Sequence, residues 1–295
     1  MKKFKRAAVY NLTRLLLFFF NIIPRRTAVF IGGWLGLAAW MLYSRDRFRI
    51  LRHLSLVYKD RLSLKEKNII SRNFFINSGK NLADVIRFRK HYRTEIKPLV
   101  TVEGLEYFDR AYKAGRGLFG ITGHIGNFEL LAVHLADLGY KIAVIGREMY
   151  DNRLDKLLVD NREAMGLTNI PTTDSPRKLL SWLKDGGAVG VLIDTDSFRV
   201  RGMFIPTFGR LSNTPVGQTI IGLKTGAAFL PMFCLRTVDN RYKIIIKPPI
   251  DCIPRDTSEE QVYLVTLKCT KALEEIINLF PDQWIWLHNR WRTRP

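Results

Sequence analysis

Cysteine is scarce in this sequence: Cys234, Cys252 and Cys269 are its only three among 295 residues. Their number is odd and no two form a CxxC pair, so a disulfide framework is excluded and free thiols are expected. The five histidines are also scattered, and none lies beside another histidine or a cysteine at the spacing of metal ligands. We therefore expect neither a metal site nor a cofactor.

Acidic residues are missing from the start of the chain, where Asp46 is the first carboxylate. Basic residues there flank two apolar runs, Leu15 to Pro24 and Thr27 to Ser44. The second run is just long enough for a bilayer core of ~30 Å, whereas the first is too short alone. A signal peptide is the alternative, but no clear small-x-small cleavage site follows Pro24. The pattern predicts a retained helical membrane anchor over 1–45, and leaves open whether it spans the bilayer or lies in its interface.

Positive charge dominates the rest of the chain as well. The formal net charge is +20, from 47 Lys and Arg against 27 Asp and Glu. Such an excess needs an anionic partner: nucleic acid, an anionic membrane or an acidic carrier protein. The charge is spread along the chain, no nucleic-acid motif is visible, and the apolar runs are unnecessary for that role. A non-catalytic protein that binds nucleic acid or anionic lipid therefore stays only as a remote alternative.

Short apolar strands alternate with helical patterns from about residue 99 onward. This alternation predicts an α/β fold with a mixed, mainly parallel sheet flanked by helices. Strands are expected at 117–122, 141–146, 188–193, 228–235 and 242–247, and helices at 128–138, 151–165, 176–184, 213–224 and 258–279. The short link 237–241 resembles a hairpin turn, so part of the sheet should be antiparallel. The expected organisation is an anchor (1–45) and one catalytic domain (46–295), made of a basic helical collar (46–98) and an α/β core (99–295).

A histidine and a carboxylate, His124 and Glu129, lie where a strand is expected to pass into a helix. Gly123 and Gly126 permit a turn that brings the two side chains together. A neutral imidazole can then accept a hydroxyl proton while the carboxylate fixes its tautomer. Since no nucleophilic Ser or Cys stands beside them, the hydroxyl should belong to a substrate. His134, inside an apolar run, is interpreted by contrast as a packed helix residue.

Further blocks follow this HxxxxE motif in a fixed order. They are Val144–Arg147, Asn152 with Leu154–Asp155, Arg162 and Gly166, Asp194–Asp196, Gly202–Arg210, Thr214–Gly217, Thr225–Ala227 and Pro281–Pro295. In order and spacing they resemble the lysophospholipid acyltransferase superfamily, in the branch of the lipid A late acyltransferases and phosphatidylinositol mannoside acyltransferases. The resemblance runs over the whole chain and implies a glycerolipid acyltransferase-like fold.

The resemblance implies O-acyl transfer from a thioester to a lipid hydroxyl, with His124 as general base and Glu129 as its assistant. Asn127, or a helix amide, is expected to donate a hydrogen bond to the thioester oxyanion. Arg147 and Arg210 are expected to hold a phosphate of the acceptor or of the carrier's phosphopantetheine.

Asp194 and Asp196 follow a buried-looking strand, where they could orient those arginines or merely cap the next turn. The aromatic and basic run from Trp284 to Arg292 suits headgroup contact, or else a docked tail that closes the core.

The implied partners are acyl carrier protein or acyl-coenzyme A as donor, an anionic membrane lipid as acceptor, and the membrane itself; nucleic acid is not expected. A glycolipid such as a lipid A precursor is favoured as acceptor over a phosphatidylinositol mannoside, a lysophospholipid or an amino-acid lipid. Basic residues on both flanks of the apolar runs place the catalytic part on the cytoplasmic face of the inner membrane.

Overall fold

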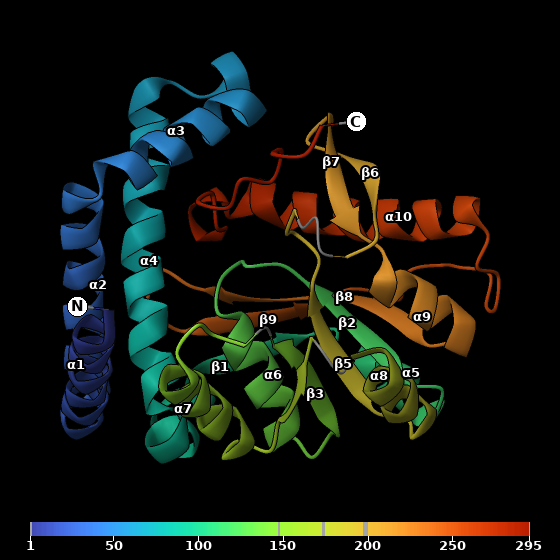
Figure 1. Cartoon of the computed structure of the whole chain (residues 1–295), viewed down its shortest axis with the longest axis horizontal. Helices are drawn as coiled ribbons and strands as arrows, with labels where there is room; N and C mark the ends of the chain where they lie inside the picture. Colours follow the sequence, from blue (N-terminus) through green and yellow to red (C-terminus); the bar gives the residue numbers. More distant parts are fainter. Residues whose placement is uncertain (1, 147, 173–174, 197–199, 295) are drawn as a thin grey trace.

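The computed structural model describes residues 2–146, 148–172, 175–196 and 200–294 (Figure 1). Its helices are α1 (Lys2–Ile22), α2 (Arg25–Leu42), α3 (Ser44–Tyr58), α4 (Leu64–His91), α5 (Leu105–Lys113), α6 (Phe128–Asp137), α7 (Asn152–Glu163), α8 (Ser175–Lys184), α9 (Gly217–Thr225) and α10 (Glu259–Leu279). Its strands are β1 (Val100–Glu103), β2 (Leu118–Thr122), β3 (Ile142–Gly146), β4 (Thr168–Pro171), β5 (Ala188–Leu192), β6 (Gly202–Thr207), β7 (Arg210–Pro215), β8 (Ala228–Arg236) and β9 (Tyr242–Ile246).

Seven of these strands form one sheet, in the order β1-β9-β8-β2-β5-β3-β4. The five strands from β8 to β4 are parallel, and β9 runs antiparallel to β8 after the expected hairpin link. Every residue of β2 is buried because helices cover both faces of the sheet. The prediction of a mixed, mainly parallel sheet flanked by helices is confirmed.

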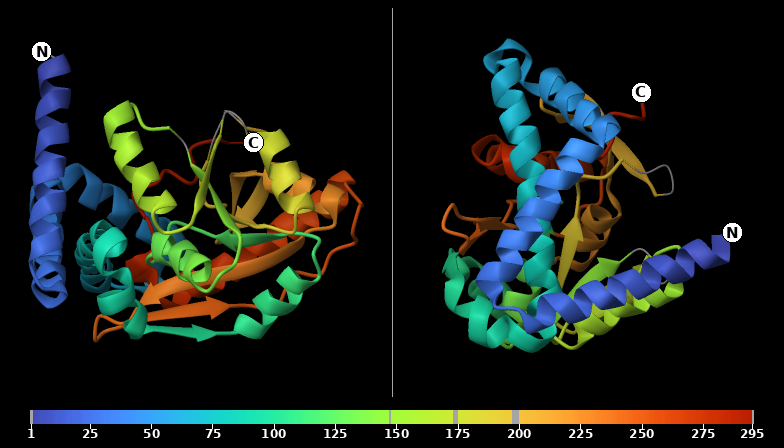
Figure 2. Two further views of the ribbon diagram at one scale, coloured as in Figure 1. Left: turned by 90° about the horizontal axis from the view of Figure 1, so that it is seen from below. Right: turned by 90° about the vertical axis from the view of Figure 1, so that its left-hand side faces the viewer.

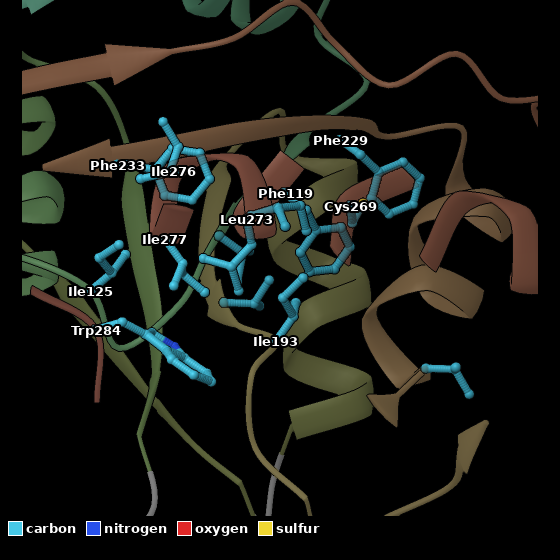
Figure 3. Close-up of a cluster of buried hydrophobic side chains, with 14 of the residues drawn as sticks. Phe119, Ile125, Ile193, Phe229, Phe233, Cys269, Leu273, Ile276, Ile277 and Trp284 are labelled. Atoms are coloured by element: carbon cyan, nitrogen blue, oxygen red, sulfur yellow. The ribbon is translucent and has the colours of Figure 1, made fainter. Parts of the chain in front are cut away.

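Side chains alternate between two cores along the central strands. Phe119 and Ile121 of β2 point into a core shared with α8, α9 and α10, while Leu118 points into one shared with α5 and α6. Figure 3 shows part of the first core, where Phe233 of β8 and Leu273 of α10 lie among other buried apolar side chains. This three-layer packing fixes the strand ends from which the site is built.

The long helix α4 forms the edge of the molecule on which the N-terminal helices lie. It begins at a capping box in which Ser63 and Glu66 bond each other's backbone amides. Gly36 of α2 approaches the Phe75 carbonyl so closely that a Cβ there would overlap it, and a Cβ on Gly32 would come within 2.5 Å of the Gly79 carbonyl oxygen. Figures 1 and 2 show α2 packed along α4, whereas α1 meets α4 near its C-terminal end and extends beside α7; both helices lie away from α8 and α9.

The structure thus gives the apolar run Thr27 to Ser44 a buried side and an exposed side. Ala28, Val29 and the glycines of α2 are buried, whereas Phe30 and Trp34 are 64% and 58% exposed. Within the described residues, no single helix is both long enough and apolar enough to cross a membrane. Helix α2 and the following segment 44–61 have the necessary length and apolar character only together, as a pair bent by 88°. The anchor over 1–45 stays a prediction.

Four parts of the fold differ from the sequence-based expectation, and one of them is helix α5, for which no helix was expected. The helix expected at 213–224 begins only at Gly217, because residues up to Pro215 pair in the β6–β7 hairpin. That hairpin was not predicted, since its polar strand β7 lacks an apolar run. Strands β1 and β4 were also missed; both have four residues and carry polar side chains.

Candidate active site

The HxxxxE loop is shaped by two glycines that have no room for a side chain. Gly126 has φ +58°, and a Cβ there would overlap the Cys234 carbonyl. A Cβ on Gly123 would come within 2.9 Å of the Asp194 carboxylate. The C-terminal segment holds the loop from the other side, since the Ile285 amide donates to the His124 carbonyl at 3.0 Å. The predicted turn is therefore present, at the carboxyl end of β2.

His124 is held by Asp194, which follows the neighbouring strand β5. One carboxylate oxygen of Asp194 lies 2.8 Å from imidazole Nδ1 and the other accepts the His124 backbone amide at 2.7 Å. The second oxygen also accepts the Trp284 indole N–H at 2.8 Å. Since an ionised carboxylate only accepts, Nδ1 carries the proton and Nε2 is the nitrogen free to take one. His124 is 26% exposed and Asp194 is 1% exposed, so the imidazole faces the site from a buried support.

The charges of this pair stabilise each other. Burial alone would lower the pKa of His124, but the negative charge and hydrogen bond of Asp194, with a smaller contribution from Glu129, raise it above its ordinary value. Burial would likewise raise the pKa of Asp194, yet His124 and the indole N–H lower it to about 2. Asp194 is consequently ionised at neutral pH and favours the protonated imidazole.

Glu129 has a different partner from the one expected. Its carboxylate receives two hydrogen bonds from Arg162 of α7, at 2.5 and 3.0 Å, in a bidentate pair. Arg162 also donates to the Asn169 side chain at 2.7 Å. The imidazole Nδ1 bond that sequence reasoning gave to Glu129 belongs to Asp194, because β5 brings that carboxylate directly alongside the loop. Glu129 acts on His124 through charge, and Arg162 is held by Glu129 rather than open to substrate.

Asn127 caps the helix instead of facing a reacting group. Its side-chain oxygen accepts the Leu130 amide at 3.1 Å, its side-chain nitrogen donates to the Tyr242 hydroxyl at 3.1 Å, and the residue is 2% exposed. These contacts account for the residue as an N-cap. The structure gives no support to Asn127 as the oxyanion donor.

Asp196 anchors the C-terminal tail. Its carboxylate accepts the amide and the hydroxyl of Thr293, each at 2.7 Å, and its own amide donates to His288 Nε2 at 2.8 Å. Trp284, Trp286 and Arg290 of the same tail are at most 1% exposed. The docked tail, and not headgroup contact, therefore describes these three residues.

The two arginines expected to hold phosphate differ in what the structure says of them. Arg147 lies outside the described residues. Arg210 is exposed at the turn of the β6–β7 hairpin, where it lines an open pocket of about 720 Å³. Other basic side chains line the same pocket; they are Arg52 and His53 of α3, and Arg292 and Arg294 of the C-terminal tail.

An apolar cavity lies beside the catalytic loop, between α6 and the sheet. Glu129, Arg162 and Thr122 line its polar end. The rest of its wall is apolar and comes chiefly from α6, β3, β5 and β8, including Leu131, Leu135, Ile142, Val144, Val191 and Met232.

A buried polar network connects this loop to the N-terminal helices. Asp84 of α4 is fully buried and pairs with Arg25 of α2 and Arg236 of β8, each at 2.8 Å. It also accepts the Tyr242 hydroxyl at 2.7 Å, and Tyr242 in turn receives the Asn127 side chain. Three cationic or hydroxyl donors thus satisfy one buried carboxylate.

Sequence reasoning missed the His124–Asp194 bond, the Glu129–Arg162 pair and the position of His288. Burial lowers the pKa of His288, which lies close enough to Asp194 and His124 for their charges to act on it. Only one signal was available beforehand: Asp194 follows an expected strand of a mainly parallel sheet, so its side chain was expected at the same edge of the sheet as the loop after β2.

The family was identified from the whole chain. The family described as bacterial lipid A biosynthesis acyltransferase matches residues 2–293, and the chain belongs to it. It is accordingly an acyl-transferring enzyme, and the resemblance noted in its sequence blocks is confirmed.

Individual relatives are similar over most of the chain. The lipid A biosynthesis palmitoleoyltransferase of Escherichia coli K12 is 24% identical over 288 residues, which cover 92% of this chain and 87% of the relative. The lauroyltransferase of the same organism is 25% identical over 272 residues, covering 90% and 85%. A phosphatidylinositol mannoside acyltransferase of Mycobacterium tuberculosis H37Rv is 25% identical over 195 residues, covering 64% and 59%.

Proposed function

We propose that this enzyme moves a fatty acyl chain from an acyl thioester to a hydroxyl group of a lipid A precursor. The observation that carries the proposal is the His124–Asp194 pair at the carboxyl end of the sheet, in a member of this family. No serine or cysteine nucleophile is needed, because the attacking oxygen comes from the acceptor. The two similar Escherichia coli relatives are both named for acyl transfer in lipid A biosynthesis.

In the proposed reaction His124 Nε2 takes the proton of the acceptor hydroxyl as its oxygen attacks the thioester carbonyl. The resulting imidazolium is stabilised by Asp194 directly and by Glu129 at longer range. The tetrahedral oxyanion then collapses, the carbon–sulfur bond breaks, and the leaving thiolate receives from His124 the proton that came from the acceptor hydroxyl. The products are an ester and a free thiol, so the protein returns to its starting protonation state.

The developing oxyanion needs a donor other than Asn127, whose side chain is occupied as a cap. The first turn of α6 begins directly after the catalytic loop, and its backbone amides carry the positive end of the helix dipole. We assign oxyanion stabilisation to the amides of Phe128 and Glu129, because the Leu130 and Leu131 amides already donate to Asn127. The bidentate Glu129–Arg162 pair keeps this turn in register with α7.

The apolar cavity between α6 and the sheet has a volume of only about 50 Å³, room for a few water molecules and not for a whole fatty acyl chain. Glu129 of α6 and Arg162 of α7 line it together with aliphatic side chains. We therefore assign to it at most the first methylene groups of the acyl chain, each of which gains roughly 0.8 kcal/mol on leaving water.

Acyl carrier protein is proposed as donor in preference to coenzyme A, because the basic pocket around Arg210 would attract an acidic carrier. A phosphatidylinositol mannoside is the second acceptor, supported by the mycobacterial relatives. We place the enzyme on the cytoplasmic face of the inner membrane, where the exposed apolar residues of α1 and α2 would meet lipid.

Comparing the lipids of cells with and without the gene tests the function. We expect one glycolipid class to lose the mass of one acyl group in the deletion strain and to regain it when the gene is restored. Restoring the His124→Ala variant should leave the lipid underacylated. An unchanged lipid A fraction with an altered mannoside fraction would favour the second acceptor, and unchanged glycolipids would refute both.

A further inference from the structure

A second pocket lies between α2, α4 and the β8–β9 link, apart from the catalytic loop. Its volume is about 710 Å³, and none of the residues assigned to catalysis lines it. Four cationic side chains line it against a single carboxylate, Asp239. The cations are Arg25, Arg26, Lys80 and Arg241.

Two of the four cations already have a carboxylate partner inside the protein. Arg25 is bonded to Asp84 and to the Asn240 carbonyl, and Arg241 pairs with Asp239 at 3.1 Å. Lys80 and Arg26 have no carboxylate or hydrogen-bond acceptor among the described residues. The pocket therefore holds two uncompensated positive charges.

Lys80 is the more constrained of the two. Its aliphatic stem lies against Gly33, where a Cβ would come within 3.1 Å of it. Burial, with repulsion from Arg236, lowers the pKa of Lys80. A half-buried ammonium group without a counter-ion is costly, and an anion bound beside it would remove that cost.

The remaining wall of the pocket is apolar and continues to the surface of α2. Phe30 and Trp34, which are in edge-to-face contact, line it and are largely exposed. Val29, Leu37 and Ile76 extend the same surface. A soluble phosphate would leave this wall in water, whereas an amphiphile would cover it.

We propose that this pocket binds one anionic phospholipid of the membrane, with its headgroup phosphate between Lys80 and Arg26 and an acyl chain along Phe30 and Trp34. Charge complementarity selects an anion, and the adjoining apolar wall selects one that carries hydrocarbon. The site is accessory: it holds a lipid at the edge of α2 and takes no part in the acyl transfer.

The test compares the full-length double variant Arg26→Gln/Lys80→Gln with Arg110→Gln/Lys113→Gln. The second pair removes the same charge from exposed positions on α5 and serves as the matched control. Binding is measured by flotation with phosphatidylcholine vesicles that contain or lack phosphatidylglycerol. A basic residue near an anionic surface contributes about 1 kcal/mol, so we expect roughly a 10- to 30-fold loss for the first variant and little change for the control.

Two further measurements, together with one possible outcome of the flotation experiment, separate this site from its alternatives. Glycerol phosphate, which has the headgroup chemistry without chains, should not compete with phosphatidylglycerol; effective competition would identify a free-phosphate site and overturn the proposal. In detergent, the Arg26/Lys80 variant should keep the turnover and acceptor KM of the wild type, and a raised acceptor KM would assign the pocket to the acceptor instead. Equal losses in both double variants would reduce the effect to net charge and also overturn it. Wild-type turnover in detergent is measured separately from vesicle binding. Failure of the proposed acyl transfer can therefore be distinguished from failure of the proposed lipid site.

Discussion

Asp194 holds His124 by two hydrogen bonds, one from the imidazole ring and one from the main chain. The same carboxylate therefore sets the position of the loop and the tautomer of the base. Its third bond, from Trp284, ties both to the C-terminal segment. A substitution at Asp194 should consequently affect protonation and geometry together.

Activity should rise with pH through the pKa of His124, because only the neutral imidazole can accept the hydroxyl proton. Since Asp194 and Glu129 raise this pKa, the acid limb of kcat/KM should have its midpoint above 6.5. Asp194→Asn removes the charge, so the limb should move to lower pH while the maximum falls by roughly 10²- to 10⁴-fold. A pH–rate profile of both proteins checks this, and an unshifted limb would contradict the assignment of Asp194.

His124→Ala should lower turnover by roughly 10²- to 10⁴-fold and leave the fold intact. The side chain is partly exposed, and its principal hydrogen bond is made with Asp194. Circular dichroism and thermal unfolding report the fold, while product formation from a thioester reports activity. His91→Gln, on α4, is a suitable control. A well-folded His124→Ala protein with near-normal turnover would remove His124 as the base.

The Glu129–Arg162 pair should behave as one unit. Glu129→Gln or Arg162→Gln alone leaves a largely buried charge without its partner, and each should cost about 1–3 kcal/mol after allowance for partial exposure. The double variant should cost less than the sum of the two. Urea unfolding of all four proteins measures the coupling, with the exposed pair Lys156–Asp160 as a control expected near zero. Glu129→Gln should also reduce turnover, but less than His124→Ala. Additive losses would refute the coupling.

Donor preference should depend on salt if an acidic carrier docks on the basic pocket around Arg210. Acyl carrier protein thioester should be the better donor at low ionic strength and should lose its advantage as salt rises. Arg210→Gln should raise the KM for that donor and leave kcat unchanged, whereas Lys113→Gln should change neither. The turnover measured with each thioester over a series of salt concentrations tests this donor preference. A preference for coenzyme A thioester at every salt concentration would overturn the donor assignment and leave the catalytic pair untouched.

The contact of α2 with α4 should tolerate no side chain at Gly36. A Cβ at this position would overlap the Phe75 backbone, which cannot move aside as a side chain can. Gly36→Val should therefore destabilise the protein by about 1–3 kcal/mol, and Leu35→Ala, at an exposed position one residue away, should have a much smaller effect. Thermal unfolding in detergent compares the two. Equal melting temperatures for wild type and Gly36→Val would show that the helices do not pack as described.

Periodicity and turn residues were sufficient to predict the central strands and most helices, because these segments are buried along a full face. They could not predict the β6–β7 hairpin, whose strand β7 is held by pairing and by Arg290 from the distant tail. Part of the site was predictable for the same reason: His124 and the turn of Gly123 and Gly126 are local in sequence.

The partners of His124 and Glu129 were not local. Asp194 is 70 residues from His124, and Arg162 is 33 residues from Glu129. Both contacts depend on which strand lies beside β2 and where α7 packs. A spacing of five residues favoured Glu129 as the imidazole's partner, whereas the sheet order gave that position to Asp194.

Through the Asp84 network, the first 45 residues contribute to the folded structure that supports the active site. A chain produced without them would leave Asp84 with Arg236 but without Arg25, and would uncover the surface of α4 on which Gly32 and Gly36 lie. The same network reaches Asn127, the cap of the helix that carries Glu129. Folding of the catalytic loop is therefore linked to docking of the N-terminal helices. A molecule in which α1 and α2 are not yet docked would lack part of the structure that supports its active site.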